Sequence, residues 1–189
     1  MDYRIRRATL ADRAALERLI AESARGLSRR DYTDEQVEAA VASVFGVDTD
    51  LILDGTYYAA EACGELVGCG GWSKRRTLFG GDRFAVRDSG ELDPSKEPAR
   101  IRAFFVHPAW ARKGVGTGIL AECERAARAY GFRSLELMAT LPGVRLYAAR
   151  GYEAGERVSY ELAGGVRLEL VPMRKELEET RNDERGTMN

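Results

Sequence analysis

The sequence predicts an α/β fold of the α+β type, with strands and helices packed together in a single domain. Three observations carry this prediction: strand-like alternation at both ends of the chain, helical spacing of apolar residues between strands, and 44% hydrophobic content in 189 residues. A chain of this size and composition can bury a sizeable core. We expect the domain to span residues 1–174, followed by a charged tail over residues 175–189 that is poor in apolar residues.

The N-terminal part of the chain predicts one strand and two helices. Residues 2–8 alternate between apolar and charged side chains, which is typical of a strand with one polar face. Thr9 with Asp12, and Thr33 with Gln36, each combine a capping hydroxyl with an acceptor three residues later. Apolar residues at helical spacing follow both pairs, so each pair is expected to begin a helix.

A β-hairpin is expected over residues 56–73, turning at residues 64–65. The cluster of Gly68, Gly70 and Gly71 is unusual inside a strand. Glycines in that setting indicate a β-bulge or the close approach of a ligand.

Residues 77–98 have no periodicity and are rich in glycine and proline, so they predict a long loop. Loops of this length in a compact domain are usually functional or disordered. This loop carries four acids that are compatible with two interpretations, attraction of a cationic amine or a solvated flap: Asp82, Asp88, Glu91 and Asp93.

The C-terminal third predicts a strand, a short helix and a closing hairpin. Residues 134–139 alternate as a strand, and residues 142–151 begin with a proline and end with a glycine, as short helices do. Residues 158–162 and 166–173 alternate around a glycine-rich turn at residues 163–165.

Composition narrows the class of protein. Lys plus Arg (29) and Asp plus Glu (30) nearly cancel, giving a net charge of −1 and an isoelectric point of about 6.0, which offers no global electrostatic case for nucleic-acid binding. The charged start and the absence of a long apolar stretch argue against a signal peptide or a membrane span.

Cysteine usage predicts a cytoplasmic protein. Three cysteines, Cys63, Cys69 and Cys123, follow no metal-ligand or CxxC spacing, and each lies within an apolar pattern. We therefore expect reduced, buried thiols and no metal site. Nucleophilic catalysis by Cys69 is disfavoured, because His107 is the one histidine available to activate it.

Residues 101–131 contain the pattern that matters most for function. An apolar strand at residues 101–106 ends at His107-Pro108, and a basic, glycine-rich turn leads into a helix that ends at Gly131. The first N–H groups of a helix have no intrahelical partner and attract anions. A phosphate-bearing ligand is therefore predicted at seven residues: Arg112, Lys113, Gly114, Val115, Gly116, Thr117 and Gly118.

Three other interpretations of this turn exist. The absence of a Gly-Lys-Ser/Thr ending argues against a P-loop, and no further glycine completes a dinucleotide fingerprint. An ordinary strand–helix turn, in which glycines only relieve strain, stays open at this point.

The segment FFVHPAWARKGVGTGIL resembles the acetyl-CoA-binding segment of the GNAT superfamily of N-acetyltransferases. That family's loop reads Gln/Arg-x-x-Gly-x-Gly/Ala; Gly114 and Gly116 match its glycines, and Ala111 stands where Gln or Arg is common. The segment RLYAARGY is similar to the family's Tyr-x-x-x-Gly-Phe/Tyr segment and contains Tyr147. The match is specific over residues 101–151.

The resemblance implies a twisted, mixed and mostly antiparallel central sheet of about seven strands flanked by about four helices, splayed between the strands near residues 104 and 137. It implies an acetyl-CoA-dependent N-acetyltransferase that acts on a primary amine of a small molecule or peptide by direct attack in a ternary complex. It also implies a possible homodimer. A non-catalytic acyl-CoA-binding sensor or interaction module of the same fold is the alternative.

The resemblance also implies roles for particular residues. Backbone groups of Phe104, Phe105 and Val106 would orient the pantetheine arm, and the backbone of residues 112–118 would hold the pyrophosphate. Tyr147 would be the general acid that protonates the CoA thiolate, against the alternative of a core tyrosine.

The resemblance also bears on other positions. Thr140 stands where many relatives carry an asparagine that contacts the cofactor. Trp72 is a candidate for substrate contact or simply a core residue. No residue is assigned as general base, although Glu61, Glu91 and Asp93 are conceivable.

Overall fold

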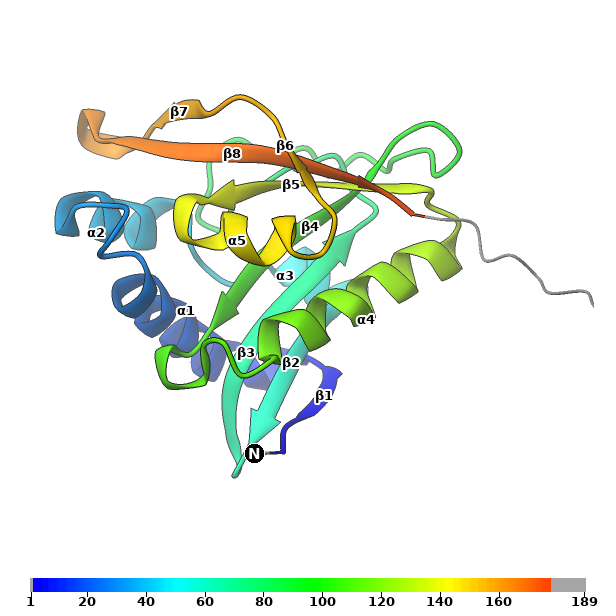
Figure 1. Ribbon diagram of the computed structural model, residues 1–189, viewed down its shortest axis with the longest axis horizontal. Coiled ribbons are helices and arrows are strands. Elements are labelled where there is room, and N and C mark those ends of the chain that lie inside the picture. The colour runs from blue at the N-terminus through cyan, green and yellow to red at the C-terminus, as the bar shows by residue number, and fades with distance from the viewer. Residues whose placement is uncertain (1, 178–189) are drawn as a thin grey trace, which may run out of the picture.

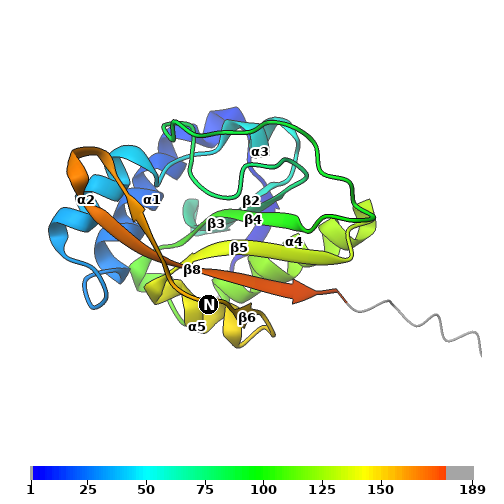
Figure 2. The same cartoon turned by 90° about the horizontal axis from the view of Figure 1, so that it is seen from above.

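The computed structural model describes residues 2–177, and within that range eight strands form one open sheet with five α-helices on its faces (Figures 1 and 2). The strands are β1 (Arg4–Arg7), β2 (Tyr57–Ala62), β3 (Glu65–Ser73), β4 (Ala99–Val106), β5 (Ser134–Thr140), β6 (Glu153–Ala154), β7 (Val158–Glu161) and β8 (Arg167–Glu176). The helices are α1 (Arg13–Leu27), α2 (Asp34–Ser43), α3 (Thr49–Leu53), α4 (Val115–Tyr130) and α5 (Val144–Ala148). Residues 178–189, most of the predicted tail, lie outside the described residues.

The sheet is mixed and mostly antiparallel, as predicted. Its strand order is β1-β2-β3-β4-β5-β8-β6, with β7 also pairing to β8. Among the described strands, β4 and β5 form the parallel pair, and every other neighbouring pair is antiparallel. The parallel pair joins the N-terminal half of the sheet to its C-terminal half, so it marks the centre of the fold.

Two apolar clusters, one on each face of the sheet, form the core. Helices α1, α2 and α3 cover one face, and α4 and α5 cover the other (Figure 2). The first face buries Leu16 and Ile20 of α1, and the second buries Ile119 and Cys123 of α4. Over residues 2–177, no helix combines the length and apolar character that crossing a membrane requires.

Both predicted helix starts are present. The Thr33 N–H donates to Gln36 Oε1 (2.9 Å) and the Gln36 N–H donates to Thr33 Oγ1 (3.2 Å), which closes a capping box at α2. The Thr9 N–H donates to the Asp12 carboxylate (2.8 Å), and a short 3₁₀ turn, Leu10–Asp12, leads into α1.

The sheet opens between β4 and β5. These strands pair at Ala99 with Leu135 and at Arg100 with Glu136, and then diverge. Residues 103–106 of β4 are only half-buried although β4 is a central strand. This is the splay that the family resemblance implies, and it leaves backbone groups of β4 without a strand partner on the β5 side.

The glycine cluster of β3, where the sequence predicts a bulge or a close ligand approach, faces a bulge in the neighbouring strand β4. The pairing of β3 with β4 shifts register between Cys69 and Gly71, and Ala103 has a positive φ of 50°. Such a conformation is unfavourable for a residue with a Cβ atom, by about 1–2 kcal/mol. Ala103 is therefore strained, and its surroundings must hold it in place.

The three glycines of β3 make room for side chains of neighbouring elements. A methyl group at Gly70 would lie 2.2 Å from the Phe104 ring, and one at Gly71 would lie 3.0 Å from the Tyr57 ring. A methyl group at Gly68 would lie 2.5 Å from Val115 of α4. The cluster thus serves the packing around the bulge on both faces of the sheet.

The structure corrects the prediction for Cys63 and decides between the two alternatives for Trp72. Cys63 is exposed, contrary to the expectation of a buried thiol, because it lies in the hairpin turn with a φ of 51°. Trp72 is 4% exposed and packs against Tyr130 and Phe132 on the α4 face, so it is a core residue. Neither the short helix α3 nor the two-residue strand β6 has a clear sequence pattern.

Candidate functional site

The glycine-rich turn and the start of α4 form the first part of the site. Helix α4 follows Gly114, which has a φ of 85°, and Arg112 also has a positive φ of 63°. Gly118 is the first residue of α4 whose N–H reaches a helical acceptor, the Gly114 carbonyl at 2.9 Å. The N–H groups of residues 115–117 precede that bond and form the first turn, where an anion binds most readily.

Side chains around the turn fix its shape and add positive charge. The Tyr3 hydroxyl donates to the Gly114 carbonyl (3.0 Å), which anchors the turn to the N-terminal strand region. A methyl group at Gly118 would lie 2.6 Å from the Tyr3 hydroxyl, so this glycine serves packing. Arg112 and Lys113 are exposed beside the turn, and the Lys113 ammonium lies 5.4 Å from the centre of the Trp110 ring.

The opening between β4 and β5 is the second part. Phe104 and Phe105 are half-buried on opposite faces of the sheet: Phe104 packs with the α4 cluster and Phe105 with the α1–α3 cluster. The Val106 N–H donates to Ser23 Oγ of α1 (3.2 Å). The backbone of residues 104–106 therefore runs along the opening with its side chains directed away to either face.

Tyr147 of α5 is the third part, and it lies beside this opening. It is 7% exposed, and its ring packs edge-on to Phe104 (6.0 Å between centroids) and Tyr152 (5.7 Å). Burial raises the pKa of the Tyr147 phenol well above its ordinary value of 10.0, and nearby Cys123 adds to the shift. At neutral pH the phenol is therefore protonated.

The turn after β5 connects Tyr147 to the other face of the sheet. A methyl group at Gly143 would lie 3.2 Å from Thr140 Oγ1 and 3.5 Å from the Tyr147 ring. Leu141, in the same turn, donates its N–H to the Tyr32 hydroxyl (2.9 Å). One short turn thus contacts both the Tyr147 side and the α1–α3 side of the opening.

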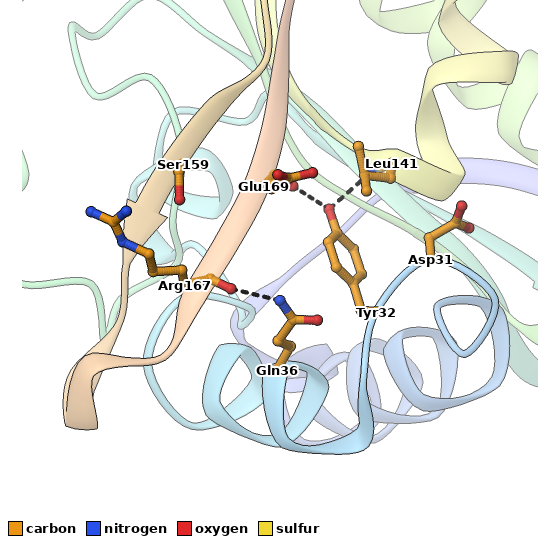
Figure 3. Close-up of a pocket in the computed structure, with 7 residues that line it drawn as sticks. All are labelled: Asp31, Tyr32, Gln36, Leu141, Ser159, Arg167 and Glu169. Carbon is orange, nitrogen blue, oxygen red and sulfur yellow. Dashed lines mark hydrogen bonds between the residues drawn. The ribbon is translucent and has the colours of Figure 1, made fainter.

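A cavity of about 380 Å³ lies on the α1–α3 face, between the α1–α2 connection and strands β7 and β8 (Figure 3). Its lining residues are Asp31, Tyr32, Gln36, Leu141, Ser159, Arg167 and Glu169.

The Tyr32 hydroxyl joins two other residues that line this cavity, since it donates to the Glu169 carbonyl (2.5 Å) and accepts from the Leu141 N–H. Burial raises the pKa of Tyr32 to about 12. The sequence alone does not indicate a role for Tyr32, because a tyrosine preceding a helix cap carries no signal of such long-range contacts.

The loop over residues 77–98 is held to the sheet by aromatic packing. Phe79 and Phe84 pack on each other (4.9 Å) and on Tyr160 of β7 (5.0 and 5.5 Å). Arg102, buried next to the bulge, donates to the Gly80 carbonyl (3.0 Å) and forms an ion pair with the fully buried Asp48. The loop is therefore fastened to both β4 and β7.

The acids of the loop, and Glu61 of β2, have partners within the chain, although Asp88 and Glu91 are exposed. Asp82 accepts from the Thr49 N–H (2.8 Å), and Asp88 accepts from the Gly90 N–H (2.8 Å). Glu91 pairs with Lys74 (2.8 Å), Asp93 pairs with Lys96 (3.3 Å), and Glu61 of β2 pairs with Arg6 (2.9 Å). These contacts favour structural roles, so none of these acids gains support as a general base.

Metal chemistry has no candidate site in the part of the chain that the structure describes. Among residues 2–177, no group of three or more His, Cys, Asp or Glu side chains is arranged to hold a metal ion. His107 instead accepts the Ala109 N–H (3.1 Å) and lies 3.6 Å from Glu22.

Comparison with known proteins connects this geometry to a family. The sequence model of the acetyltransferase (GNAT) family matches residues 16–152, from α1 to the residue before β6. This range includes the turn, the opening and Tyr147. A comparison with curated proteins finds no sequence match.

Solved structures share the fold. A GCN5-related N-acetyltransferase from Rhodopseudomonas palustris superposes with a TM-score of 0.70 at 22% identity, over 94% of this chain and 97% of that one. The PaiA N-acetyltransferase from Thermoplasma acidophilum, in complex with coenzyme A, superposes with a TM-score of 0.63 at 15% identity, over 93% of this chain and 99% of that one. A ribosomal-protein-alanine N-acetyltransferase from Brucella melitensis superposes with a TM-score of 0.61 at 20% identity, over 92% of this chain and 99% of that one.

Proposed function

The chain belongs to the acetyltransferase (GNAT) family, and from this premise we propose that it transfers an acetyl group from acetyl-CoA to a primary amine of a small molecule or peptide. The observation that carries the proposal is the opening between β4 and β5, which has the first turn of α4 at one end and the protonated, buried Tyr147 beside it. A phosphate-binding turn, an exposed strand backbone and a proton donor are the parts that thioester aminolysis needs.

Acetyl-CoA is the proposed co-substrate. Its pyrophosphate would bind the N–H groups of the turn over residues 112–118, with Arg112 and Lys113 adding positive charge. Backbone groups of Phe104, Phe105 and Val106 would orient the pantetheine arm and polarise the acetyl carbonyl. At Val106 this leaves the carbonyl, because its N–H donates to Ser23 Oγ. The positive φ of Gly114 and the half-buried state of residues 104–106 support this assignment.

The proposed reaction proceeds by direct attack in a ternary complex. The amine nitrogen forms a bond to the acetyl carbonyl carbon while the carbonyl electrons move to oxygen. The oxyanion re-forms the carbonyl as the C–S bond breaks, and the thiolate takes the proton of the Tyr147 hydroxyl. The nitrogen, which is positively charged after the attack, loses a proton to water and becomes the neutral amide. A lysine-like amine has a pKa of about 10.4, so its surplus proton must first leave to water or a base. The Tyr147 phenolate that remains after the thiolate is protonated regains a proton from solvent.

The acceptor amine is proposed to enter from the α1–α3 face. The cavity of about 380 Å³ supports this, because Leu141 lines it and lies in the turn that contacts Tyr147 (Figure 3). Exposed side chains of both charges, Asp31, Arg167 and Glu169, border the cavity. Such a lining is compatible with a small polar amine and with the end of a peptide.

Tyr32→Phe is expected to raise KM for the acceptor by about threefold to tenfold and to leave KM for acetyl-CoA nearly unchanged. The change removes the hydroxyl that joins the α1–α2 connection to Leu141 and Glu169, while the turn of α4 is untouched. Steady-state kinetics with each substrate varied in turn measures both constants. An equal rise in both KM values would contradict a role on the acceptor side.

We also propose a domain over residues 1–174 with a tail over residues 175–189, a cytoplasmic location and a homodimer. Strand β8 ends at Glu176, close to the proposed boundary. All three cysteines are free thiols, which is compatible with a reducing compartment. The homodimer rests on the family resemblance alone.

The proposal is tested by calorimetric titration of the purified protein with acetyl-CoA, with ATP as the control ligand. Micromolar binding of acetyl-CoA and no response to ATP are expected. Primary amines are then screened for thiol release. Acetyl-CoA binding without turnover on any amine would favour the non-catalytic acyl-CoA-binding module, and tight ATP binding without acetyl-CoA binding would contradict the co-substrate.

A further inference from the structure

We propose that Tyr57 and Ser23 are positioning residues for acetyl transfer, because they hold the two ends of the β4 segment 103–106 along the opening. Tyr57 fixes the carbonyl of Ala103, and Ser23 fixes the N–H of Val106. This inference rests on the proposed function, in which the backbone of this segment orients the acyl group.

The segment needs support from outside its own strand pairing. It begins with Ala103 at a positive φ of 50°, and β5 has already diverged after Arg100. Backbone groups on the β5 side therefore have no ladder partner, and buried backbone groups require one. A strained and half-paired segment keeps one geometry only if side chains from neighbouring elements fix it.

Tyr57 supplies this support at the first end. It is fully buried on β2, two strands away from Ala103, and its hydroxyl donates to the Ala103 carbonyl (3.1 Å). The ring can lie across β3 because Gly71 has no side chain, and a methyl group there would lie 3.0 Å from the ring. The Cys69 thiol, kept protonated by burial that raises its pKa to about 12, lies 3.8 Å from the same carbonyl.

Ser23 supplies support at the second end. It is 4% exposed on α1, and its Oγ accepts the Val106 N–H (3.2 Å). The serine of α2 behaves differently, since the Ser43 hydroxyl donates to the Ala39 carbonyl one turn earlier (2.7 Å). That local bond is what a helical serine commonly makes. Ser23 Oγ instead accepts a hydrogen bond from the backbone of β4.

The rest of α1 brings Ser23 close to the end of β4. A methyl group at Gly26 would lie 2.3 Å from the Pro108 ring, so α1 approaches the residues after β4 more closely than a side chain would permit. Glu22 lies 3.6 Å from His107 in the same region. Three neighbouring positions of α1 thus contact the end of β4 and the two residues that follow it.

The two contacts lie on either side of Phe104, whose ring packs against Tyr147. A shift of the 103–106 backbone would therefore move both the groups that orient the acyl carbonyl and the ring beside the proton donor. Small misplacements in a reacting geometry lower rates steeply, by about 10²-fold for 1 Å. The two hydroxyls are thus expected to affect turnover while touching neither substrate.

The experiment compares Tyr57→Phe and Ser23→Ala with two matched controls. Tyr58→Phe removes the hydroxyl of the neighbouring buried tyrosine, which packs on the opposite face of the sheet. Ser43→Ala removes the hydroxyl that bonds within its own helix. Ser23→Thr keeps the hydroxyl and serves as the rescue variant. Each variant is measured for kcat, for the Kd of CoA and for the ¹⁵N–¹H amide shifts of residues 103–106 without ligand.

Tyr57→Phe and Ser23→Ala are expected to lower kcat by about tenfold or more and to leave the Kd of CoA within about twofold, because the turn of α4 is unchanged. The amide signals of residues 103–106 should move in both variants. Tyr58→Phe and Ser43→Ala should keep kcat and these signals near the wild type, and Ser23→Thr should recover most of the rate.

Equal losses of kcat in the control variants, or amide signals that stay in place in both test variants, would overturn the inference. If Tyr57→Phe does not fold, the comparison of Ser23→Ala with Ser23→Thr still decides. The outcome is separable from the proposed function: an inactive wild type rejects the enzyme, whereas the amide shifts of the ligand-free variants report on the segment independently.

Discussion

Tyr147→Phe is expected to lower kcat for acetyl transfer by about 10²-fold or more, the usual contribution of a positioned general acid. The substitution removes the hydroxyl and keeps the ring, so the packing with Phe104 and Tyr152 is retained. Binding of acetyl-CoA should change little, because the turn over residues 112–118 is on another element. Steady-state kinetics of thiol release and calorimetry with CoA measure the two effects separately.

The pH dependence gives a second measure of the same role. Burial raises the pKa of Tyr147 above 10.0, so the acid form that donates the proton persists as the pH rises through the physiological range and is lost only at higher pH. Any fall of the wild-type kcat between pH 7 and pH 10 therefore belongs to another group. Tyr147→Phe should show the same profile over this range at a lower level, which a pH series of kcat measures.

Tyr152→Phe is the matched control for Tyr147→Phe. Tyr152 is 3% exposed, and its ring lies 5.7 Å from that of Tyr147. Its hydroxyl is on the same face of the sheet but has no role in the proposed reaction, so kcat should remain near the wild-type value. A loss as large in Tyr152→Phe as in Tyr147→Phe would show that packing, and not proton donation, explains the effect.

The sequence predicts this site best where the physics is local. The turn of residues 112–118 and the start of α4 follow from glycines next to an apolar strand and a helical pattern, although the anchoring bond from Tyr3 to Gly114 spans 111 positions. The capping box at Thr33 is local throughout, because its two hydrogen bonds join residues three positions apart. Side-chain chemistry at short spacing is sufficient to predict such elements.

Contacts between distant segments leave no such pattern. Tyr32 bonds Leu141 across 109 positions, Tyr57 bonds Ala103 across 46, and Val106 bonds Ser23 across 83. A buried tyrosine or serine looks like any core residue until the fold brings its partner close. For this reason the glycine cluster of β3 could be predicted to adjoin a bulge, whereas the residues that support the bulge could not.

The exposed Cys63 shows a limit of pattern reading at element boundaries. Its apolar neighbours indicate a buried strand, but the hairpin turn includes it and requires a positive φ. Periodicity reports which face a residue would take in a continuing strand. It does not report where the strand stops.

Replacing Gly116 by leucine is expected to weaken acetyl-CoA binding by about tenfold to hundredfold, the loss that follows when one or two hydrogen bonds to a charged group are broken. Gly116 lies in the first turn of α4, and a methyl group there would lie 3.1 Å from Leu146 and 3.5 Å from Val106. A larger side chain would therefore extend toward β4 and α5, where it would occupy the opening and displace the turn. Calorimetric titration of the variant with acetyl-CoA measures the change.

A graded series makes this prediction sharper. Gly116→Ala adds only the methyl group, which Leu146 can accommodate by a small shift, so its effect should be much smaller than that of Gly116→Leu. Gly46→Ala is the control, because Gly46 has no neighbouring atom within 4 Å of a methyl group at that position, and it should bind acetyl-CoA as the wild type does. If Gly116→Leu shows a cooperative thermal unfolding transition, and is therefore folded, but binds acetyl-CoA with unchanged affinity, the ligand does not use the first turn of α4. The turn would then be an ordinary strand–helix connection, and the phosphate site would have to be sought elsewhere along the opening.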